Sequence, residues 1–290
     1  MKKYFAMLLA GMMAVSLVAC GGSSTASAPA EAPAEAEAEA EAPAEEETTE
    51  AEAPAETTEE TAEMTTVEAG VLHMATNAAF PPYEMISDND GFEGIDVEIA
   101  TEIARKLGLE LVVDDMEFGS VITSVQSGKS DIAMAGLTVT EERKQNVDFT
   151  TSYATGIQVI IVPEDSDILT VDDIANDKMI GVQDGTTGYI YCSDDYGEDH
   201  ITSYTNGAMA IEALKGGKVD AVVIDNEPAR AFVAANDGLK ILDTEYIVEN
   251  YAIGVSKDNP GLCEAVNNAL TELIADGTVQ MIVDKYITAE

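Results

Sequence analysis

From residue 71 onward the chain alternates short apolar segments with amphipathic ones, and this alternation constrains the fold more than any other feature. The segment VLHMAT (71–76) predicts a short buried strand. The segment GIDVEIATEIARKLG (94–108) predicts a helix, because its isoleucines recur at four-residue spacing and Gly108 supplies a stop signal. Strands that alternate with helices indicate an α/β fold of βαβ units around a largely parallel sheet.

The alternation continues to the C-terminal end. Pro260 fits the first turn of a helix, and Gly277 fits the break between two consecutive helices. Further strands are predicted at 109–116, 131–137, 179–183, 200–204, 221–225 and 239–243, and further helices at 120–128, 207–217, 227–237, 261–277 and 278–287.

Two segments of the chain repeat one pattern. QSGKSDIAMAG (126–136) and KGGKVDAVVID (215–225) both read as a helix end, a Gly-Lys pair, an aspartate and a buried strand. Either two βαβ turns resemble each other by chance, or the chain folds into two similar α/β lobes. Ligands of such sheets bind beyond the carboxyl ends of the strands. This rule would bring Gly136, Thr138 and Asp225 to one cleft.

The first 20 residues have the pattern of a secretion signal. Lys2 and Lys3 precede an apolar stretch that is shorter than the roughly 20 residues of a comfortable membrane span. The stretch ends in LVAC followed by GG, which resembles a bacterial lipobox. By that resemblance Cys20 receives a diacylglycerol anchor and becomes the mature N-terminus. The alternative is an ordinary cleaved signal with an incidental cysteine.

Residues 21–65 have the composition of a disordered linker rich in Ala, Glu and Pro. The segment contains 14 glutamates, without any aspartate, lysine or arginine, and very few large apolar residues. Such a sequence cannot offset the entropy of ordering, and its prolines and like charges favour an extended chain. We expect a tether that lifts a folded domain off a membrane surface.

The charge and the cysteines exclude several function classes. The formal net charge is −41, so the surface repels the phosphates of DNA and RNA, and we expect no nucleic-acid partner. Cys192 and Cys263 follow far along the chain without metal-ligand spacing. We interpret them as free thiols, with one disulfide as the alternative. The chain has two histidines, which argues against a histidine-centred active site. We expect no metal and no cofactor.

Five motifs together resemble the family 3 extracellular solute-binding proteins, the amino-acid receptors of ABC importers. They are ATNAAFPPYEM (75–85), GFEGIDVEIATEIARKLG (91–108), the long segment at 116–153, IGVQDGTTG (180–188) and VDAVVIDNEPA (219–229). The resemblance implies a two-lobed periplasmic-binding-protein-like fold of type II, whose lobes are joined by two hinge strands. Lobe one would comprise 66–157 and 252–290, and lobe two 158–251.

The resemblance also implies a receptor for a zwitterion. Arg143 matches the residue that binds the α-carboxylate, and its planar fork suits that group. Its alternative role is a surface ion pair with a neighbouring glutamate. Asp225 matches the partner of the α-ammonium group, and its alternative role is to cap a helix. We expect further carboxylate donors from Gly136, Thr138 and a helix beginning near Thr140, and from Thr186 or Thr187 in GTTG (185–188).

Three more positions match the pocket for the ligand side chain. Phe80 and Phe118 would flank it, although either residue could simply belong to the core. Asn77 stands where many relatives carry aspartate, and a neutral amide compensates poorly for burying a lysine or arginine head. We therefore predict a polar, uncharged amino acid. The alternative is that Glu84 restores a negative charge near this position, which would suit a basic side chain.

The function that follows is non-catalytic capture of a free amino acid and its delivery to an ABC transporter permease. We expect a monomer on the cell surface, anchored by lipid at Cys20 to the outer face of the bacterial cytoplasmic membrane. One alternative is a sensor or receptor subunit that signals through a partner. Another is a dehydratase-like enzyme on the same fold, which would need a positioned acid and base.

Overall fold

The computed structural model describes residues 63–175, 177–243 and 246–287. The expected signal segment (1–20), Cys20 and almost all of the expected linker (21–65) lie outside the described residues. Among the described residues, no helix combines the length and the apolarity that crossing a membrane requires.

The first lobe contains a five-stranded sheet in the order β5-β1-β6-β14-β7. The strand β1 lies parallel to both β5 and β6, whereas β14 runs antiparallel to its neighbours β6 and β7. The strands are β1 (Val71–Thr76), β5 (Glu110–Asp115), β6 (Ile132–Ala133), β7 (Val147–Phe149) and β14 (Gly254–Ser256).

The second lobe contains a sheet in the order β10-β9-β11-β8-β12, with β13 also paired to β8. Its parallel core β10-β9-β11 repeats the arrangement β5-β1-β6 of the first sheet. The two echoed segments end in β6 and β11, which hold equivalent positions, and this favours two similar lobes over chance. The strands are β8 (Ala154–Pro163), β9 (Ile180–Gln183), β10 (Ile201–Tyr204), β11 (Ala221–Asp225), β12 (Leu239–Ile241) and β13 (Ile247–Tyr251).

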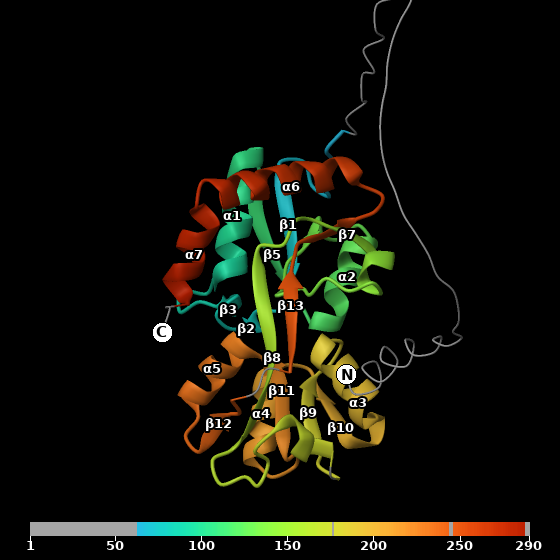
Figure 1. Ribbon diagram of the computed structural model, residues 1–290. Coiled ribbons are helices and arrows are strands. Elements are labelled where there is room, and N and C mark those ends of the chain that lie inside the picture. Colours follow the sequence, from blue (N-terminus) through green and yellow to red (C-terminus); the bar gives the residue numbers. More distant parts are fainter. Residues whose placement is uncertain (1–62, 176, 244–245, 288–290) are drawn as a thin grey trace, which may run out of the picture. The chain divides into compact units, whose positions relative to one another are not determined.

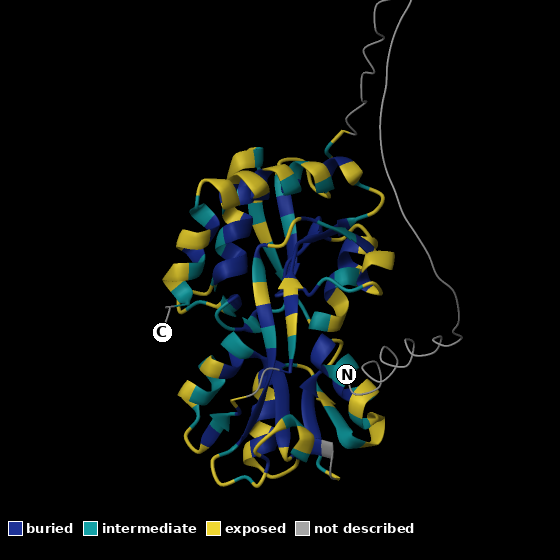
Figure 2. Cartoon of the chain, viewed as in Figure 1, coloured by how far each residue is buried: buried dark blue, intermediate teal, exposed yellow. Residues whose placement is uncertain are grey.

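Helices cover the two sheets, and the strands between them form the dark blue buried centre of each lobe in Figure 2. In α1 the isoleucines at positions 95, 99 and 103 are fully buried, as their spacing predicts, and Gly108 ends the helix in a left-handed conformation. The α-helices are α1 (Ile95–Leu107), α2 (Phe118–Gln126), α6 (Pro260–Ala275) and α7 (Thr278–Tyr286) in the first lobe, and α3 (Thr187–Tyr196), α4 (Gly207–Lys215) and α5 (Asn226–Ala235) in the second.

Two antiparallel strands, β8 and β13, run side by side through the middle of Figure 1 and connect the lobes. The pairing continues toward the first lobe, because the N–H of Tyr153 donates to the carbonyl of Tyr251 at 3.0 Å. A small sheet, β2-β3-β4, lies beside them. Its strands are β2 (Ala79–Phe80), β3 (Glu84–Ile86) and β4 (Phe92–Glu93). The described residues also form short 3₁₀ helices, namely η1 (Arg143–Gln145), η2 (Val171–Ala175) and η3 (Glu198–His200).

Two expectations were wrong in extent. The strand predicted at 131–137 is regular only at Ile132–Ala133, because Gly136 turns the backbone to a φ of +52°. The helix expected near Thr140 is the single 3₁₀ turn η1, which is too short to carry an appreciable dipole. The cysteines Cys192 and Cys263 are free thiols, as interpreted from the sequence.

Candidate functional site

Every ligand-binding residue expected from the sequence lines one small cavity between the two lobes. The first lobe contributes residues from the ends of β1, β2 and β6 and from the starts of α2 and η1, whereas the second contributes the start of α3 and the end of β11. The expected residues on the wall are Asn77, Phe80, Phe118, Gly136, Thr138, Arg143, Thr186, Thr187 and Asp225, and Glu84, Ala135 and Gln183 complete it.

Arg143 is the buried cation of this cavity. Its exposed fraction is 7%, which excludes the alternative role in a surface ion pair; Glu141 pairs with Lys144 instead. The guanidinium group donates to the carbonyl of Thr138 at 2.8 Å and to the carbonyl of Gly185 at 3.2 Å. It also lies over the ring of Phe118, 5.3 Å from the centroid, where cation–π attraction favours it.

Asp225 is the buried carboxylate on the other side of the cavity. It lies at the end of β11 and directly before α5, but its side chain makes no capping hydrogen bond, so helix capping does not explain it. One carboxylate oxygen accepts from the hydroxyl of Tyr251 and the other from Nε2 of Gln158 at 2.8 Å. Burial, followed by the charge of Glu249, raises the pKa of Asp225 to about 7.

A buried aspartate positions the loop after β6. Asp96 Oδ2 accepts from the N–H of Gly136 at 2.9 Å and from the hydroxyl of Tyr153 at 2.8 Å. The N–H of Gly136 is therefore paired with Asp96, and the expectation that backbone N–H groups around Gly136 and Thr138 donate to a ligand carboxylate stays a prediction. Gly136 is nevertheless required, because a Cβ atom there would come within 2.7 Å of the Phe80 ring.

The loop GTTG begins α3 at the cavity wall. Thr186 caps the helix by accepting from the N–H of Tyr189 at 3.3 Å, and its hydroxyl donates to the carbonyl of Gln183 at 2.8 Å. Thr187 is the first residue of the helix and is 3% exposed. The N-terminal end of α3, with its partial positive charge, thus faces the same cavity as Arg143.

Glu84 is the strongest feature that sequence reasoning mentioned but did not place in the site. Its exposed fraction is 0%, and within the described residues no N–H or hydroxyl group donates to its carboxyl oxygens. Its neighbour is the carboxyl group of Asp96, to which it hydrogen-bonds when it carries a proton. Burial, together with the negative charge of Asp96, raises its pKa well above the ordinary value for glutamate. A buried carboxyl group that lines a cavity and is paired only with another carboxyl group can bind a polar guest.

Asn77 and Gln183 join the two lobes directly. Gln183 Nε2 donates to Asn77 Oδ1 at 3.0 Å, while Asn77 Nδ2 donates to the carbonyl of Met116 at 2.8 Å. The cavity has a volume of about 20 Å³, roughly the space of one water molecule. Entry of a larger guest therefore requires the lobes to separate, which breaks this hydrogen bond while they are apart.

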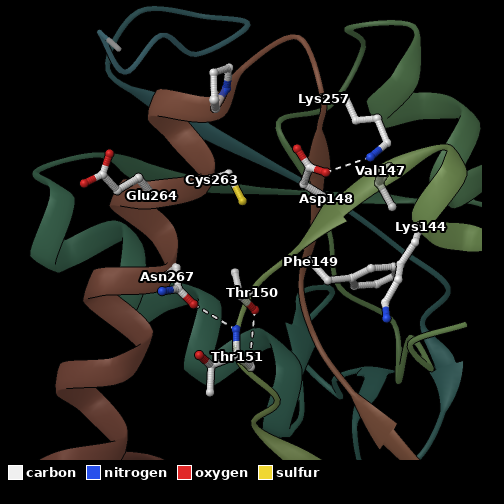
Figure 3. A pocket seen from close by; sticks show the side chains of 11 residues that line it. Lys144, Val147, Asp148, Phe149, Thr150, Thr151, Lys257, Cys263, Glu264 and Asn267 are labelled. Carbon is white, nitrogen blue, oxygen red and sulfur yellow. Dashed lines mark hydrogen bonds and ion pairs between the residues drawn. The ribbon is translucent and has the colours of Figure 1, made fainter. Parts of the chain in front are cut away.

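A second hollow, of about 780 Å³, opens on the first lobe between β7 and the start of α6 (Figure 3). Several of the polar groups drawn in it are paired with one another. Lys257 contacts Asp148 at 2.7 Å, and the N–H of Thr151 donates to Asn267 Oδ1 at 2.8 Å. This surface hollow contains no buried charge comparable with Arg143 or Glu84.

Two α/β lobes joined by paired strands, with opposite charges buried in one cavity between them, define a bilobal binding protein of the type II periplasmic class. The chain belongs to the bacterial extracellular solute-binding proteins, family 3, whose family model matches residues 72–289. Both the fold class and the family expected from the sequence are confirmed.

Individual relatives agree with this assignment. The ABC transporter arginine-binding protein 1 of Escherichia coli (strain K12) is 32% identical over 74% of this chain and 90% of its own length. A solved ancestral arginine-binding protein bound to glutamine is 37% identical, covers 77% of this chain and all of its own, and has a TM-score of 0.73. The ancestral amino-acid-binding protein AncCDT-1, a precursor of cyclohexadienyl dehydratase, is 29% identical, covers 75% of this chain and 95% of its own, and has a TM-score of 0.70.

Proposed function

We propose that the protein captures a free amino acid outside the cell and delivers it to the permease of an ABC importer. The observation that carries the proposal is the placement of Arg143 and Asp225, a buried cation and a buried carboxylate from different lobes, on the wall of one cavity. A free amino acid is a zwitterion whose two charged groups match this pair.

The cavity offers a separate receptor for each end of the zwitterion. Two of the five guanidinium N–H groups of Arg143 bind backbone carbonyls, and we assign others to the ligand carboxylate, assisted by Thr187 and the N-terminus of α3. Each oxygen of Asp225 retains a second lone pair for the ammonium group. Since the contacts come from both lobes, binding would favour the closed arrangement.

For the ligand side chain we propose a polar, uncharged group. The amides of Asn77 and Gln183 are neutral, and burial raises the pKa of Glu84, which favours the uncharged form of its carboxyl group. A protonated carboxyl can donate one hydrogen bond and accept another, which suits a carboxamide. Phe80 and Phe118 would enclose the aliphatic part of such a side chain.

A second candidate is a cationic side chain, and Glu84 is the specific observation that favours it. A guanidinium or ammonium group beside its two carboxyl oxygens would lower the pKa of Glu84 and ionise it. The names of the relatives include both classes of ligand, since one is an arginine-binding protein and another was solved with glutamine.

Calorimetric titration of the purified protein with the free amino acids tests the function and separates the two candidates. We expect micromolar or tighter binding of one or a few of them, with the ligand recovered unchanged. In the cationic case Asn77→Asp strengthens binding further and Glu84→Gln weakens it, whereas a neutral ligand tolerates Glu84→Gln. Recovery of a converted product would instead support the dehydratase-like alternative.

We further propose the location and organisation expected from the sequence. Cys20 carries the lipid anchor on the outer face of the cytoplasmic membrane, residues 21–65 act as the tether, and the protein is a monomer. The lobe boundaries at 157/158 and 251/252 lie in or directly after the strands β8 and β13 that connect the lobes. Incorporation of radiolabelled palmitate that persists after Cys20→Ala would refute the anchor.

A further inference from the structure

Glu249 is a buried carboxylate on β13 that does not line the cavity. Its exposed fraction is 4%, and the phenol group of Tyr191 interacts with its carboxylate. It lies on one of the two strands that connect the lobes, and that strand also carries Tyr251, the hydroxyl partner of Asp225.

A single amide group ties Glu249 to Asp225. Gln158 Nε2 donates to Asp225 Oδ2 and to Glu249 Oε2, both at 2.8 Å. The side chain of Gln158 is almost fully buried, and the two bonds use both hydrogens of its amide. The two acceptor oxygens therefore lie within two hydrogen-bond lengths of each other, inside the protein.

Two carboxylates this close repel each other strongly when both are ionised, because screening by water is weak at buried positions. Arg143 is the cation that faces them, and it is also the proposed receptor for the ligand carboxylate. The titratable and charged groups that face Asp225 are Tyr83, Glu84, Asp96, Arg143, Tyr191, Glu249 and Tyr251, with Glu227 beyond Tyr83. Among the described residues, acidic groups thus outnumber the one cation that faces them, Arg143, and the negative charge of the cluster is only partly compensated.

We propose that Glu249 completes the ammonium site as a second carboxylate behind Asp225, and that this pair holds one proton until the α-ammonium group of the ligand displaces it. The proposal rests on the proposed function. The displaced proton goes to solvent, while the ligand retains all three ammonium hydrogens. Glu249 is a positioning residue, because it acts through Asp225 and Gln158 rather than by touching the ligand.

The sign of the resulting pH dependence follows from the proton that must leave. Below the pKa of Asp225, which is about 7, binding requires deprotonation, and affinity falls as the pH falls. Between pH 8 and pH 6 we expect a loss of about tenfold. Glu249→Gln keeps the size and a polar end but removes the repelling charge. The pKa of Asp225 then drops, and the ratio of the two affinities moves toward one.

The test is calorimetry of the purified protein with L-glutamine and L-arginine at pH 6 and pH 8. At pH 7 each titration is repeated in two buffers of different ionisation enthalpy, which counts the protons released. Glu142→Gln serves as the control, since it removes an exposed carboxylate beside Arg143 and should keep the wild-type pH ratio. The thermal unfolding midpoint of each variant monitors folding.

The outcomes separate this inference from the proposed function. Binding with proton release in the wild-type protein, reduced in Glu249→Gln, supports the carboxylate pair. Binding that is equal at pH 6 and pH 8 and independent of the buffer overturns the pair and leaves amino-acid capture intact. If Glu249→Gln leaves the ratio of the affinities at pH 8 and pH 6 unchanged, Glu249 does not contribute to the pH dependence. If this variant does not fold, the proton count of the wild-type protein still decides whether the pair holds a proton. Failure of every free amino acid to bind overturns the proposed function itself, and the inference with it.

Discussion

Arg143 of the first lobe donates a hydrogen bond to the backbone carbonyl of Gly185 in the second lobe, with a distance of 3.2 Å between Nη2 and the oxygen. The same guanidinium group is fixed from below by Phe118 and from the side by the carbonyl of Thr138. The contacts with Phe118 and Thr138 lie within the first lobe, so they position the guanidinium group before any carboxylate arrives, and Gly185 adds its contact when the lobes close. Such preorganisation reduces the entropic cost of binding.

The guanidinium fork of Arg143 is expected to matter more than its charge. Lysine at this position keeps the charge but cannot donate two parallel hydrogen bonds, and each bond to a charged group contributes about 1.5–3 kcal/mol. Arg143→Lys should therefore weaken ligand binding by roughly 10- to 100-fold, as measured by calorimetry. Lys144→Ala is the control, because Lys144 is exposed and pairs with Glu141. Equal effects of the two variants would contradict the role of Arg143.

Gly136 is expected to be the most sensitive glycine beside the cavity. Alanine would suffer from the left-handed backbone, at about 1–2 kcal/mol, and would also collide with Phe80. Gly128→Ala shares the positive φ but has open space around the added Cβ. Urea unfolding should show Gly136→Ala to be less stable than Gly128→Ala by about 1–3 kcal/mol. Equal stabilities of the two variants would mean that the Phe80 contact is unimportant.

The hydrogen bond between Gln183 and Asn77 is expected to slow lobe opening. Since a guest larger than a water molecule requires the lobes to separate, this bond breaks each time a ligand enters or leaves. In stopped-flow measurements Gln183→Ala should release ligand several-fold faster. Gln126→Ala removes a bond to Asn146 within the first lobe and should leave the release rate unchanged.

The two described cysteines are expected to differ in reactivity. Burial, and to a lesser degree the charge of Asp195, raises the pKa of Cys192 to about 12, and its side chain is 0% exposed. Cys263 is half-buried on α6. A thiol reagent added to the folded protein should modify Cys263 slowly and Cys192 after unfolding. Rapid modification of Cys192 in the folded protein would show that the second lobe opens locally.

The sequence was most informative where periodicity and motif position agreed. Local chemistry alone accounts for the burial of the isoleucines in α1, the stop at Gly108, the place of Pro260 in the first turn of α6 and the left-handed Gly277. The strand 71–76 was predicted to the residue, and so was the strand 221–225. Local patterns failed around Gly136, where a tertiary hydrogen bond to Asp96 bends the chain.

The sequence was least informative about polar groups that meet across the fold. Gln158, Asp225 and Glu249 are joined by hydrogen bonds that span 67 and 91 positions, and neither Gln158 nor Glu249 carries a signal of its own in the sequence. The weight of Glu84 likewise depends on its burial beside the carboxyl group of Asp96, which only coordinates reveal. Gln183 was overlooked although it lies in the motif IGVQDGTTG, because the sequence does not show that its side chain meets Asn77 of the other lobe.

The central claim is that a free amino acid is held at both ends of its zwitterion, between Arg143 and Asp225. Calorimetry with a bound amino acid, its α-carboxamide and its N-acetyl derivative tests this claim most directly, because each derivative removes one charge and keeps the side chain. We predict that either modification weakens binding by roughly 100-fold or more, since it leaves a buried charge without its partner. Binding of either derivative as tight as that of the free amino acid would contradict the account.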